Sequence, residues 1–442
     1  MMLLHVAAEI EHSLMVEYLF SAYCFGGPQV PSSLRKAVRR WQEIILGVAK
    51  EEMGHLMTVQ NVLTALGAPL NLNRENYPWD IGLYPFPFAL ERPTLDSIAK
   101  YVLAESAPTW SDPPAGEIKR RAGASAHAVV NHVGALYELI IAILGRPDLI
   151  ADSAFQARTL PLQSSWDTWG RGYTQGQRGQ ESGNVPGALS PELIVLRVIS
   201  RDSALFALRQ VGEQGEGAGD PSPAVGEESH FRRFLTIWTE MRQLSAADQR
   251  LVSQPVAENP CTSRMADDGS DRYVQGKQTK NWIANPAALA WAHLFNLRYR
   301  MLLVNLIHSM RPVSPQRDAT PVVDRGILIN RTFAEMYNLR VIASTLVQLP
   351  LDAANPRGLR AGAPFEMPYT LDIPQRESDR WLLQRDLLQA SRFTINDLRS
   401  QVSSSNGLRF LAALESSDQL AAQRVDAILS DRPVMTLDED PR

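Results

Sequence analysis

Cysteine is scarce in this sequence: only Cys24 and Cys261 occur among 442 residues, far apart and without Cys-x-x-Cys spacing. Two isolated cysteines exclude a disulfide framework and a zinc site built from thiolates. Small proteins of oxidising compartments, which depend on disulfides, contain many more. The scarcity favours a reducing compartment, and we therefore expect a cytoplasmic protein.

An excess of charge of one sign is also lacking. Lys and Arg number 44 and Asp and Glu number 48, which gives a formal net charge of −4 at pH 7. Proteins that bind nucleic acid or anionic membrane surfaces carry a basic excess. The balance predicts no nucleic-acid partner and no membrane partner. Hydrophobic residues at 45% and charged residues at 21% are ordinary for a globular protein.

The sequence has no uninterrupted apolar run of the length that a membrane span needs. The longest apolar stretch, residues 287–307, contains two arginines and a histidine, so it predicts a buried helix. The first twelve residues include histidine and glutamate and have no basic segment. We therefore expect no signal peptide there.

The stretch that organises the chain is residues 41–66. Placed on a helix, one face is apolar except at Glu52 and His55, which lie three residues apart and therefore on the same side. A carboxylate and an imidazole inside a helical bundle need polar partners or a metal ion, because burying them alone is costly. An inward-facing Glu-x-x-His pair is half of the ligand set of carboxylate-bridged dimetal bundles.

Other expected helices carry inward-facing residues of the same kinds. Glu11 lies in the middle of an apolar face of the helix expected over residues 2–25, and Glu138 lies in the helix expected over 117–144. A fourth expected helix starts at residue 190 and is followed by a glutamate, and a fifth carries a histidine. The candidate metal ligands are therefore Glu11, Glu52, His55, Glu138, Glu213 and His230.

The fourth helix departs from the ideal ligand pattern. Glu213-x-x-Glu216 contains no histidine, and the nearest one, His230, follows a glycine-rich segment. Glu227-x-x-His230 restores the spacing, but on the fifth helix. Either His230 reaches the site from a separate segment, or the second metal ion has an unusual ligand set.

Chemistry explains why carboxylates and imidazoles would be combined in this way. Two adjacent divalent iron or manganese ions need bridging carboxylates to offset their charge, and terminal imidazoles leave positions open for dioxygen. The set therefore predicts two iron ions, or two manganese ions. Other interpretations stay open: the same residues could form buried ion pairs, Glu213 could be a solvated helix end, and His293 or His308 could be an axial haem ligand.

The expected fold is all-α, with a metal-binding helical domain over residues 1–250 and a second helical domain over 251–442. Four helices are expected in the second domain, at 286–311, 323–349, 375–402 and 407–429. Two irregular segments, the aromatic loop 77–88 and residues 155–187, are the expected walls of a substrate pocket, because long irregular segments in compact domains are often functional.

Several motifs, in order, resemble the ferritin-like family that contains the iminophenyl-pyruvate dimer synthases. The similar stretches are AAEIEHSLMVEYLFSAY, AKEEMGHLMTVQNVLTALG, NHVGALYELI, VGEQGEG and ESHFRRF, and later PVAENP, NPAALAWAHLFNLRYRMLL and AGAPFEMPY. The similarity covers most of residues 3–370. The violacein-pathway imine dimerase and the chromopyrrolic acid synthases belong to this family, and they are considerably longer chains.

The resemblance implies a ferritin-like four-helix bundle with the six candidate residues at its metal-binding positions. It further implies oxidative chemistry in secondary metabolism on an amino-acid-derived or indolic small-molecule substrate, with dioxygen as the oxidant. In the named enzymes a flavin amino-acid oxidase supplies an indole-pyruvate imine that is coupled to a second copy, and haem has been associated with that branch. The alternative function is a ferritin-like metal- or haem-binding protein without catalytic turnover.

Overall fold

The computed structural model describes residues 1–81, 84, 86–107, 109–123, 133–164, 195–216, 228–263, 281–311, 324–367 and 371–431. These residues form helices and isolated β-bridges but no strand, which confirms the all-α class. The chain divides into two compact units, Met1–Asn259 and Pro260–Arg442, whereas the sequence placed the division after residue 250. Among the described residues, no helix is both long enough and apolar enough to cross a membrane.

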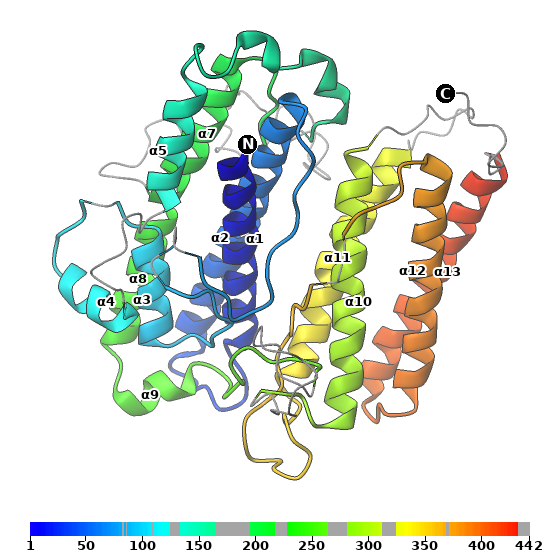
Figure 1. Ribbon diagram of the computed structural model, residues 1–442. Helices are drawn as coiled ribbons and strands as arrows, with labels where there is room; N and C mark the ends of the chain where they lie inside the picture. The colour runs from blue at the N-terminus through cyan, green and yellow to red at the C-terminus, as the bar shows by residue number, and fades with distance from the viewer. Residues whose placement is uncertain are drawn as a thin grey trace, which may run out of the picture. The chain divides into compact units, whose positions relative to one another are not determined.

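The first unit is built on the long pair α1 (Met2–Cys24) and α2 (Arg35–Ala65), which pack side by side (Figure 1). Helix α1 is buried on nearly all sides, as its uniformly apolar sequence predicts. The turn between the helices uses Gly26 and Gly27 at φ 88° and 113°, backbone conformations that favour glycine. A Cβ atom on Gly27 would also lie 2.2 Å from the side-chain nitrogen of Gln254.

Shorter helices complete the first unit. Helix α3 packs against α4 and α8, and α5 packs against α7 (Figure 1). The bounds are α3 Leu95–Ala104, α4 Ala115–Ala122, α5 Val133–Leu144, the 3-10 helices η1 Asp152–Ala154 and η2 Ala157–Leu162, α7 Arg201–Glu216, α8 His230–Arg242 and α9 Ala246–Leu251.

Two helix boundaries in this unit differ from the sequence prediction. The helix expected over 117–144 is interrupted after Ala122, because Gly123 takes a left-handed conformation at φ 68° and ends α4. The fourth helix was expected from residue 190, but residues 195–200 are not helical and α7 begins at Arg201. It then continues through two glycines to Glu216.

The second unit consists of four long helices: α10 (Pro286–Ser309), α11 (Asp324–Leu346), α12 (Glu377–Arg399) and α13 (Ser405–Asp431). Their positions follow the sequence prediction to within a few residues. Helix α10 packs against α11 and α12, and α12 packs against α13. Asn285 caps α10 by accepting hydrogen bonds from two backbone N–H groups of the first turn.

Candidate metal centre

Five acidic and imidazole side chains converge in the interior of the first unit. We call this group the carboxylate–histidine cluster; its members are Glu11, Glu52, His55, Glu105 and His230. Each of the five is at most 2% exposed to solvent. Ionisable groups buried this deeply need partners of opposite charge, hydrogen bonds or a metal ion.

Two helix interiors and two helix ends position the cluster. Glu11 lies in the middle of α1, and Glu52 and His55 share one face of α2. Glu105 directly follows the last residue of α3, and His230 is the first residue of α8. Trp238 Nε1 on α8 donates to the backbone oxygen of Leu95 at 3.1 Å, which holds α8 against α3. The second half of the cluster therefore depends on how two helix ends meet.

The first half of the cluster is formed by Glu11, Glu52 and His55. Nδ1 of His55 lies 3.1 Å from Oε2 of Glu52 and 3.4 Å from Oε2 of Glu11. One ligand atom from each of the three residues lies within 4.8 Å of the others. A single metal ion could be bound by all three.

The second half is formed by Glu52, Glu105 and His230. Nδ1 of His230 lies 2.7 Å from Oε1 of Glu52 and 3.7 Å from Oε2 of Glu105. Glu52 therefore uses one oxygen toward each half, as a carboxylate that bridges two metal ions does. The rings of His55 and His230 are nearly parallel, with centroids 5.4 Å apart.

Three oxygen and nitrogen atoms of the cluster have no hydrogen-bond partner among the described residues. Glu11 Oε2, Glu52 Oε1 and His230 Nδ1 are buried and make no hydrogen bond within the described part of the chain. Glu52 Oε1 and His230 Nδ1 lie 2.7 Å apart and form an ion pair when the imidazole is protonated. Orphaned oxygen and nitrogen donors of this kind fit a pair of iron or manganese ions.

Hydrogen bonds from surrounding side chains orient the cluster. Tyr137 Oη donates to Glu11 Oε1 at 2.5 Å, and Tyr18 Oη donates to Glu105 Oε1 at 2.5 Å. Nε2 of His55 lies 2.8 Å from the amide oxygen of Gln214. Such outer contacts fix the rotamers of metal ligands and raise their affinity for the ion.

Glu51 supports His230 from the side away from the cluster. Its carboxylate accepts from His230 Nε2 at 2.7 Å and pairs with the guanidinium of Arg233. Burial alone would raise the pKa of Glu51, but the contacts with His230 and Arg233 lower it below its usual value. Glu51 therefore stays ionised and holds the imidazole in one orientation.

Burial and mutual charge shift the pKa values of the cluster's ionisable groups in different directions. Burial, followed by the negative charge of Glu52, raises the pKa of Glu11 to about 8. Burial opposes the charged form of His55, but Glu52 and Glu11 overcome this and raise its pKa to about 10. Burial likewise opposes a charged Glu52, yet the neighbouring histidines lower its pKa well below the usual value. Burial also opposes a charged His230, but Glu52, Glu105 and Glu51 raise its pKa well above the usual value. At neutral pH the metal-free cluster therefore holds protons on Glu11, His55 and His230.

A family model of ferritin-like proteins matches residues 4–239, which is more than half of the chain. The chain belongs to the ferritin-like family. The matched residues include all five members of the carboxylate–histidine cluster. A ferritin-like bundle places inward carboxylates and Glu-x-x-His pairs around two metal ions, and the cluster has the same donor types.

Two curated enzymes are similar to this ferritin-like chain. The dichlorochromopyrrolate synthase of Lentzea aerocolonigenes is 28% identical over 386 residues, which cover 81% of this chain and 35% of that enzyme. The 2-imino-3-(indol-3-yl)propanoate dimerase of Chromobacterium violaceum is 26% identical over 392 residues, which cover 83% of this chain and 33% of that enzyme. The expected resemblance to the imine dimer synthases is confirmed. The chain spans about a third of the length of these relatives, and no solved structure matches it.

The structure brings four of the six predicted ligands together and leaves two outside. Glu11, Glu52, His55 and His230 belong to the cluster, and His230 reaches it from α8, a separate segment from the fourth helix. Glu138 on α5 and Glu213 on α7 are exposed. Glu213 accepts a hydrogen bond from Gln210 on its own helix. The ferritin-like cluster uses neither side chain.

Glu105 is the member that the sequence did not suggest. It follows Ile98 and Val102 on the buried face of the short helix α3, so an apolar stripe ending in a carboxylate could have identified it. Glu227, of the Glu227-x-x-His230 spacing, lies outside the described residues, as does most of the predicted wall 155–187.

The aromatic loop expected to form a wall contributes one buried tyrosine, Tyr84, that is close enough to Glu105 and Glu52 for their charges to affect its pKa. Tyr84 stacks on Phe88 with ring centroids 4.1 Å apart, and its hydroxyl is buried without a hydrogen-bond partner among the described residues. Burial, then the negative charges of Glu17 and Glu105, raises its pKa well above the usual value. The Tyr84 hydroxyl is therefore neutral and available to a molecule beside the cluster.

The two histidines that the sequence suggested as alternative axial haem ligands differ in environment. His293 on α10 is exposed, whereas His308 on the same helix is buried against Trp381 at a centroid distance of 4.6 Å. Neither ring nitrogen of His308 has a hydrogen-bond partner among the described residues. His308 is therefore the better candidate of the two for an axial ligand.

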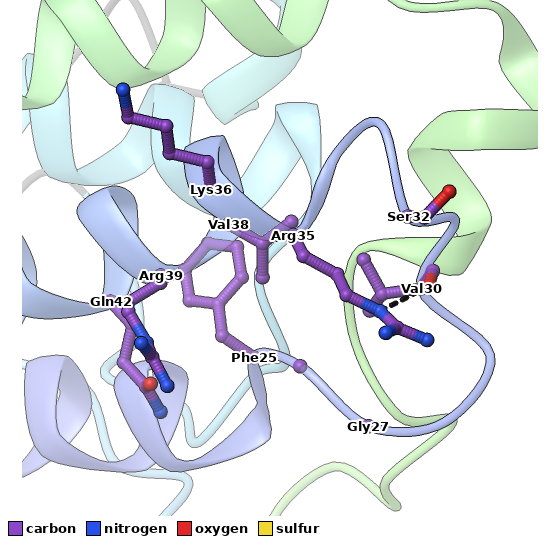
Figure 2. Close-up of a pocket in the computed structure, with 10 residues that line it drawn as sticks. Phe25, Gly27, Val30, Ser32, Arg35, Lys36, Val38, Arg39 and Gln42 are labelled. Atoms are coloured by element: carbon purple, nitrogen blue, oxygen red, sulfur yellow. Dashed lines mark hydrogen bonds between the residues drawn. The ribbon is translucent and has the colours of Figure 1, made fainter.

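A surface pocket of about 670 Å³ lies where α1 ends and α2 begins. Arg35, Lys36 and Arg39 line it, but in Figure 2 their side chains extend in different directions and do not face a common point. Gln42, the lining residue nearest the cluster along α2, is ten residues before Glu52, or about 15 Å along the helix axis. The pocket is therefore separate from the cluster.

Replacing Glu51 with glutamine is expected to weaken binding at the half that contains His230. The amide cannot balance the charge of Arg233 or accept from the imidazole as strongly, and loss of such a contact typically costs about 10–100-fold in metal affinity. Metal titration followed by mass spectrometry should show one ion bound normally and the second weakly. Glu43→Gln, on an exposed position of α2, is the matched control. Equal affinities in both variants would contradict the positioning role of Glu51.

Metal binding to the cluster is expected to release protons. The pKa values of about 8 for Glu11 and about 10 for His55 mean that both groups are protonated at pH 7, whereas metal ligands must be deprotonated. Apparent metal affinity should therefore rise as the pH increases from 6 to 8. Calorimetric titrations in buffers of different ionisation enthalpy measure the protons released. A binding heat that is the same in every buffer would contradict the prediction.

Proposed function

We propose that this chain is a metal-dependent oxidase or oxygenase of secondary metabolism with a carboxylate-bridged pair of metal ions, iron or manganese. Glu52 would bridge the ions, Glu11 and His55 would complete one ligand set, and Glu105 and His230 would complete the other. The observation that carries the proposal is the pair of Glu–His groups that share Glu52 and leave buried donor atoms unpartnered. Two redox-active metal ions, when bound, supply the capacity to activate dioxygen.

The residues of the chain have separate tasks in this proposal. Tyr137 and Tyr18 hold Glu11 and Glu105 in fixed rotamers by donating to one oxygen of each. This leaves the other oxygen of each carboxylate toward the metal positions. Tyr84 and Phe88 are buried and stacked on each other, and the Tyr84 hydroxyl would donate a hydrogen bond to a substrate.

The relatives support a proposal for the substrate class, because their names describe an imino-indolylpropanoate dimerase and a dichlorochromopyrrolate synthase. We propose oxidative coupling of an amino-acid-derived, indolic imine for this chain. One carbon–carbon bond would form between two copies, and two hydrogens would leave as electrons and protons that dioxygen accepts. A flavin amino-acid oxidase would supply the unstable imine, which makes such an enzyme the proposed partner.

Metal analysis together with the visible spectrum tests the cofactor. About two iron or manganese ions per chain without a Soret band would support the dimetal centre. A Soret band that is lost in His308→Ala would move the chemistry to haem. Absence of both after aerobic reconstitution with ferrous iron would overturn each cofactor, and the cluster would then be a buried ion-pair network.

Oxygen uptake tests the reaction. The imine is generated in situ from L-tryptophan by an L-amino-acid oxidase, with catalase present, and the products are followed by mass spectrometry. Uptake above that of the oxidase alone, with a product of dimer mass, supports coupling. A loaded protein that gives neither would support the alternative, a ferritin-like metal- or haem-binding protein without turnover.

Replacing Tyr84 with phenylalanine is expected to raise KM for the imine about 5–30-fold, the effect of losing one hydrogen bond of about 1–2 kcal/mol to the substrate. Metal content should not change, because Tyr84 contacts none of the proposed ligands directly. Tyr77→Phe is the comparison variant, since Tyr77 Oη donates to the backbone oxygen of Ser13 at 2.8 Å. An unchanged KM in Tyr84→Phe would contradict a contact with substrate.

A further inference from the structure

The second unit contains one polar level in which a buried arginine contacts two carboxylates. Buried Arg298 on α10 donates to Glu335 on α11 at 2.9 Å and to Asp418 on α13 at 2.5 Å. Ser391 on α12 donates to the same oxygen of Asp418 at 2.7 Å. One residue from each of the four helices thus meets at this level, and both carboxylates are in contact with the arginine.

Helix register defines a second polar level above the first. His308 on α10 packs against Trp381 on α12. Arg298 lies ten residues before His308, Ser391 lies ten residues after Trp381, and both contact Asp418. The two helices are therefore antiparallel. A residue a given number of positions before His308 on α10 lies level with the residue the same number of positions after Trp381 on α12. Asn305 and Gln384 satisfy this rule, so they lie opposite each other about one turn, or ~4.5 Å, from His308 and Trp381.

This second level has polar atoms without partners. Its members are Asn305, His308, Arg331, Trp381 and Gln384, and we call it the Asn305–Gln384 layer. Both side-chain amide atoms of Asn305 and Gln384, both ring nitrogens of His308, Nε1 of Trp381 and both terminal nitrogens of Arg331 are buried and lack a hydrogen-bond partner within the described ranges. Asn305, His308, Trp381 and Gln384 are 0% exposed.

Polar atoms without partners are costly in a dry interior. A buried donor or acceptor that stays unsatisfied loses the hydrogen bonds that it makes with water, and the layer contains nine such atoms. Their combined cost is large beside the marginal stability of a typical domain. A molecule enclosed by the layer would supply the missing partners.

The charge of the layer indicates the nature of that molecule. Arg331 brings a buried guanidinium whose charge interacts with Glu335 and Asp418, but its terminal nitrogens make no hydrogen bond with either carboxylate, and both carboxylates contact Arg298. Burial, and then the positive charges of Arg380 and Arg331, lower the pKa of His308 to about 3, so its ring is neutral. Burial also lowers the pKa of Arg331. The layer thus presents positive charge with mainly N–H donors, which an anion would complement.

We propose that the Asn305–Gln384 layer is a binding site for a small carboxylate. The two terminal nitrogens of Arg331 match the two oxygens of a carboxylate in a bidentate contact. Trp381 Nε1 and the amide nitrogens of Asn305 and Gln384 supply further donors. The two amide oxygens accept from a hydroxyl group on the same molecule, so a hydroxy acid such as glycolate should bind more tightly than acetate.

Calorimetry on the full chain, dialysed into chloride buffer of constant ionic strength, tests the site. We expect saturable binding of acetate and tighter binding of glycolate, with affinity for glycolate at least tenfold weaker in Arg331→Met. Arg340→Met, an exposed position on the same helix, should bind as the wild type does. No carboxylate binding by the wild type would show that the layer encloses water only and would overturn the proposal. Nitrate binding as tight as that of glycolate would overturn the assignment to carboxylates.

A second variant covers the case in which Arg331→Met fails to fold. The double variant Asn305→Leu, Gln384→Met removes four of the unpartnered atoms and keeps the side chains of similar size. It should melt at a higher temperature than the wild type in chloride alone and should lose the response to glycolate. Retention of wild-type glycolate affinity in this folded variant would contradict the site.

Discussion

Glu52→Gln is expected to lose both metal ions under conditions that load the wild-type protein. The side chain offers one oxygen to each half of the carboxylate–histidine cluster, so the amide weakens both ligand sets at once. Contacts that only orient a ligand contribute about 10–100-fold to metal affinity, and a shared ligand should therefore contribute more than ~100-fold. Metal content after gel filtration, measured by mass spectrometry, gives the result directly.

Glu138→Gln and Glu213→Gln are the matched controls for this experiment. They make the same chemical change at exposed positions of the same unit, and the sequence pattern alone had suggested both as ligands. Each should retain both metal ions. If either control lost metal while Glu52→Gln kept it, the ligand assignment from the structure would be contradicted. Far-ultraviolet circular dichroism confirms that all three variants are folded.

Arg298→Met is expected to lower the free energy of unfolding of the second unit by about 3–5 kcal/mol. The change removes the guanidinium that contacts the buried carboxylates of Glu335 and Asp418. Hydrogen exchange in peptides from α10 and α12, followed over a urea series, reports on this unit alone. The side chain is almost fully buried, so the effect should change little with salt.

Two further variants separate loss of charge balance from loss of packing. Arg399→Met breaks a partly exposed pair with Glu415 and should cost less than about 1 kcal/mol. The triple variant Arg298→Met, Glu335→Gln, Asp418→Asn removes all three charges and should recover most of the lost stability. A cost for Arg298→Met no larger than that for Arg399→Met would contradict a dominant role of the buried ion pairs.

The sequence predicted the elements of the fold well where the chain is periodic. The two long N-terminal helices and the four C-terminal helices were placed to within a few residues; for α2, Ser32 or Ser33 was the expected cap and the helix begins at Arg35. The prediction was wrong where a glycine took a left-handed conformation, at Gly123, and where residues 195–200 were not helical in spite of their apolar content. Both outcomes depend on local backbone conformations that hydrophobic spacing does not determine.

The candidate site shows the same limit at the level of single residues. Tyr137, which contacts the cluster, directly precedes the predicted Glu138, and Gln214 directly follows the predicted Glu213. A shift of one residue rotates a side chain by about 100° around the helix. The sequence therefore located the right helical turns but, on short or interrupted helices, not the face that points inward. On the long helices α1 and α2, many apolar positions define the face, and Glu11, Glu52 and His55 were correctly placed inside.

The position of Glu105 and His230 at helix ends has a consequence for the way this chain can diversify. The two side chains are held by the packing of α3 against α8, and the chain between them, residues 106–229, carries α4, α5 and α7 as well as Tyr137 and Gln214. Insertions or deletions in the connections of that segment would leave the spacing of Glu105 and His230 unchanged. The surroundings of the cluster can therefore be rebuilt while the arrangement of Glu105 and His230 is inherited unaltered.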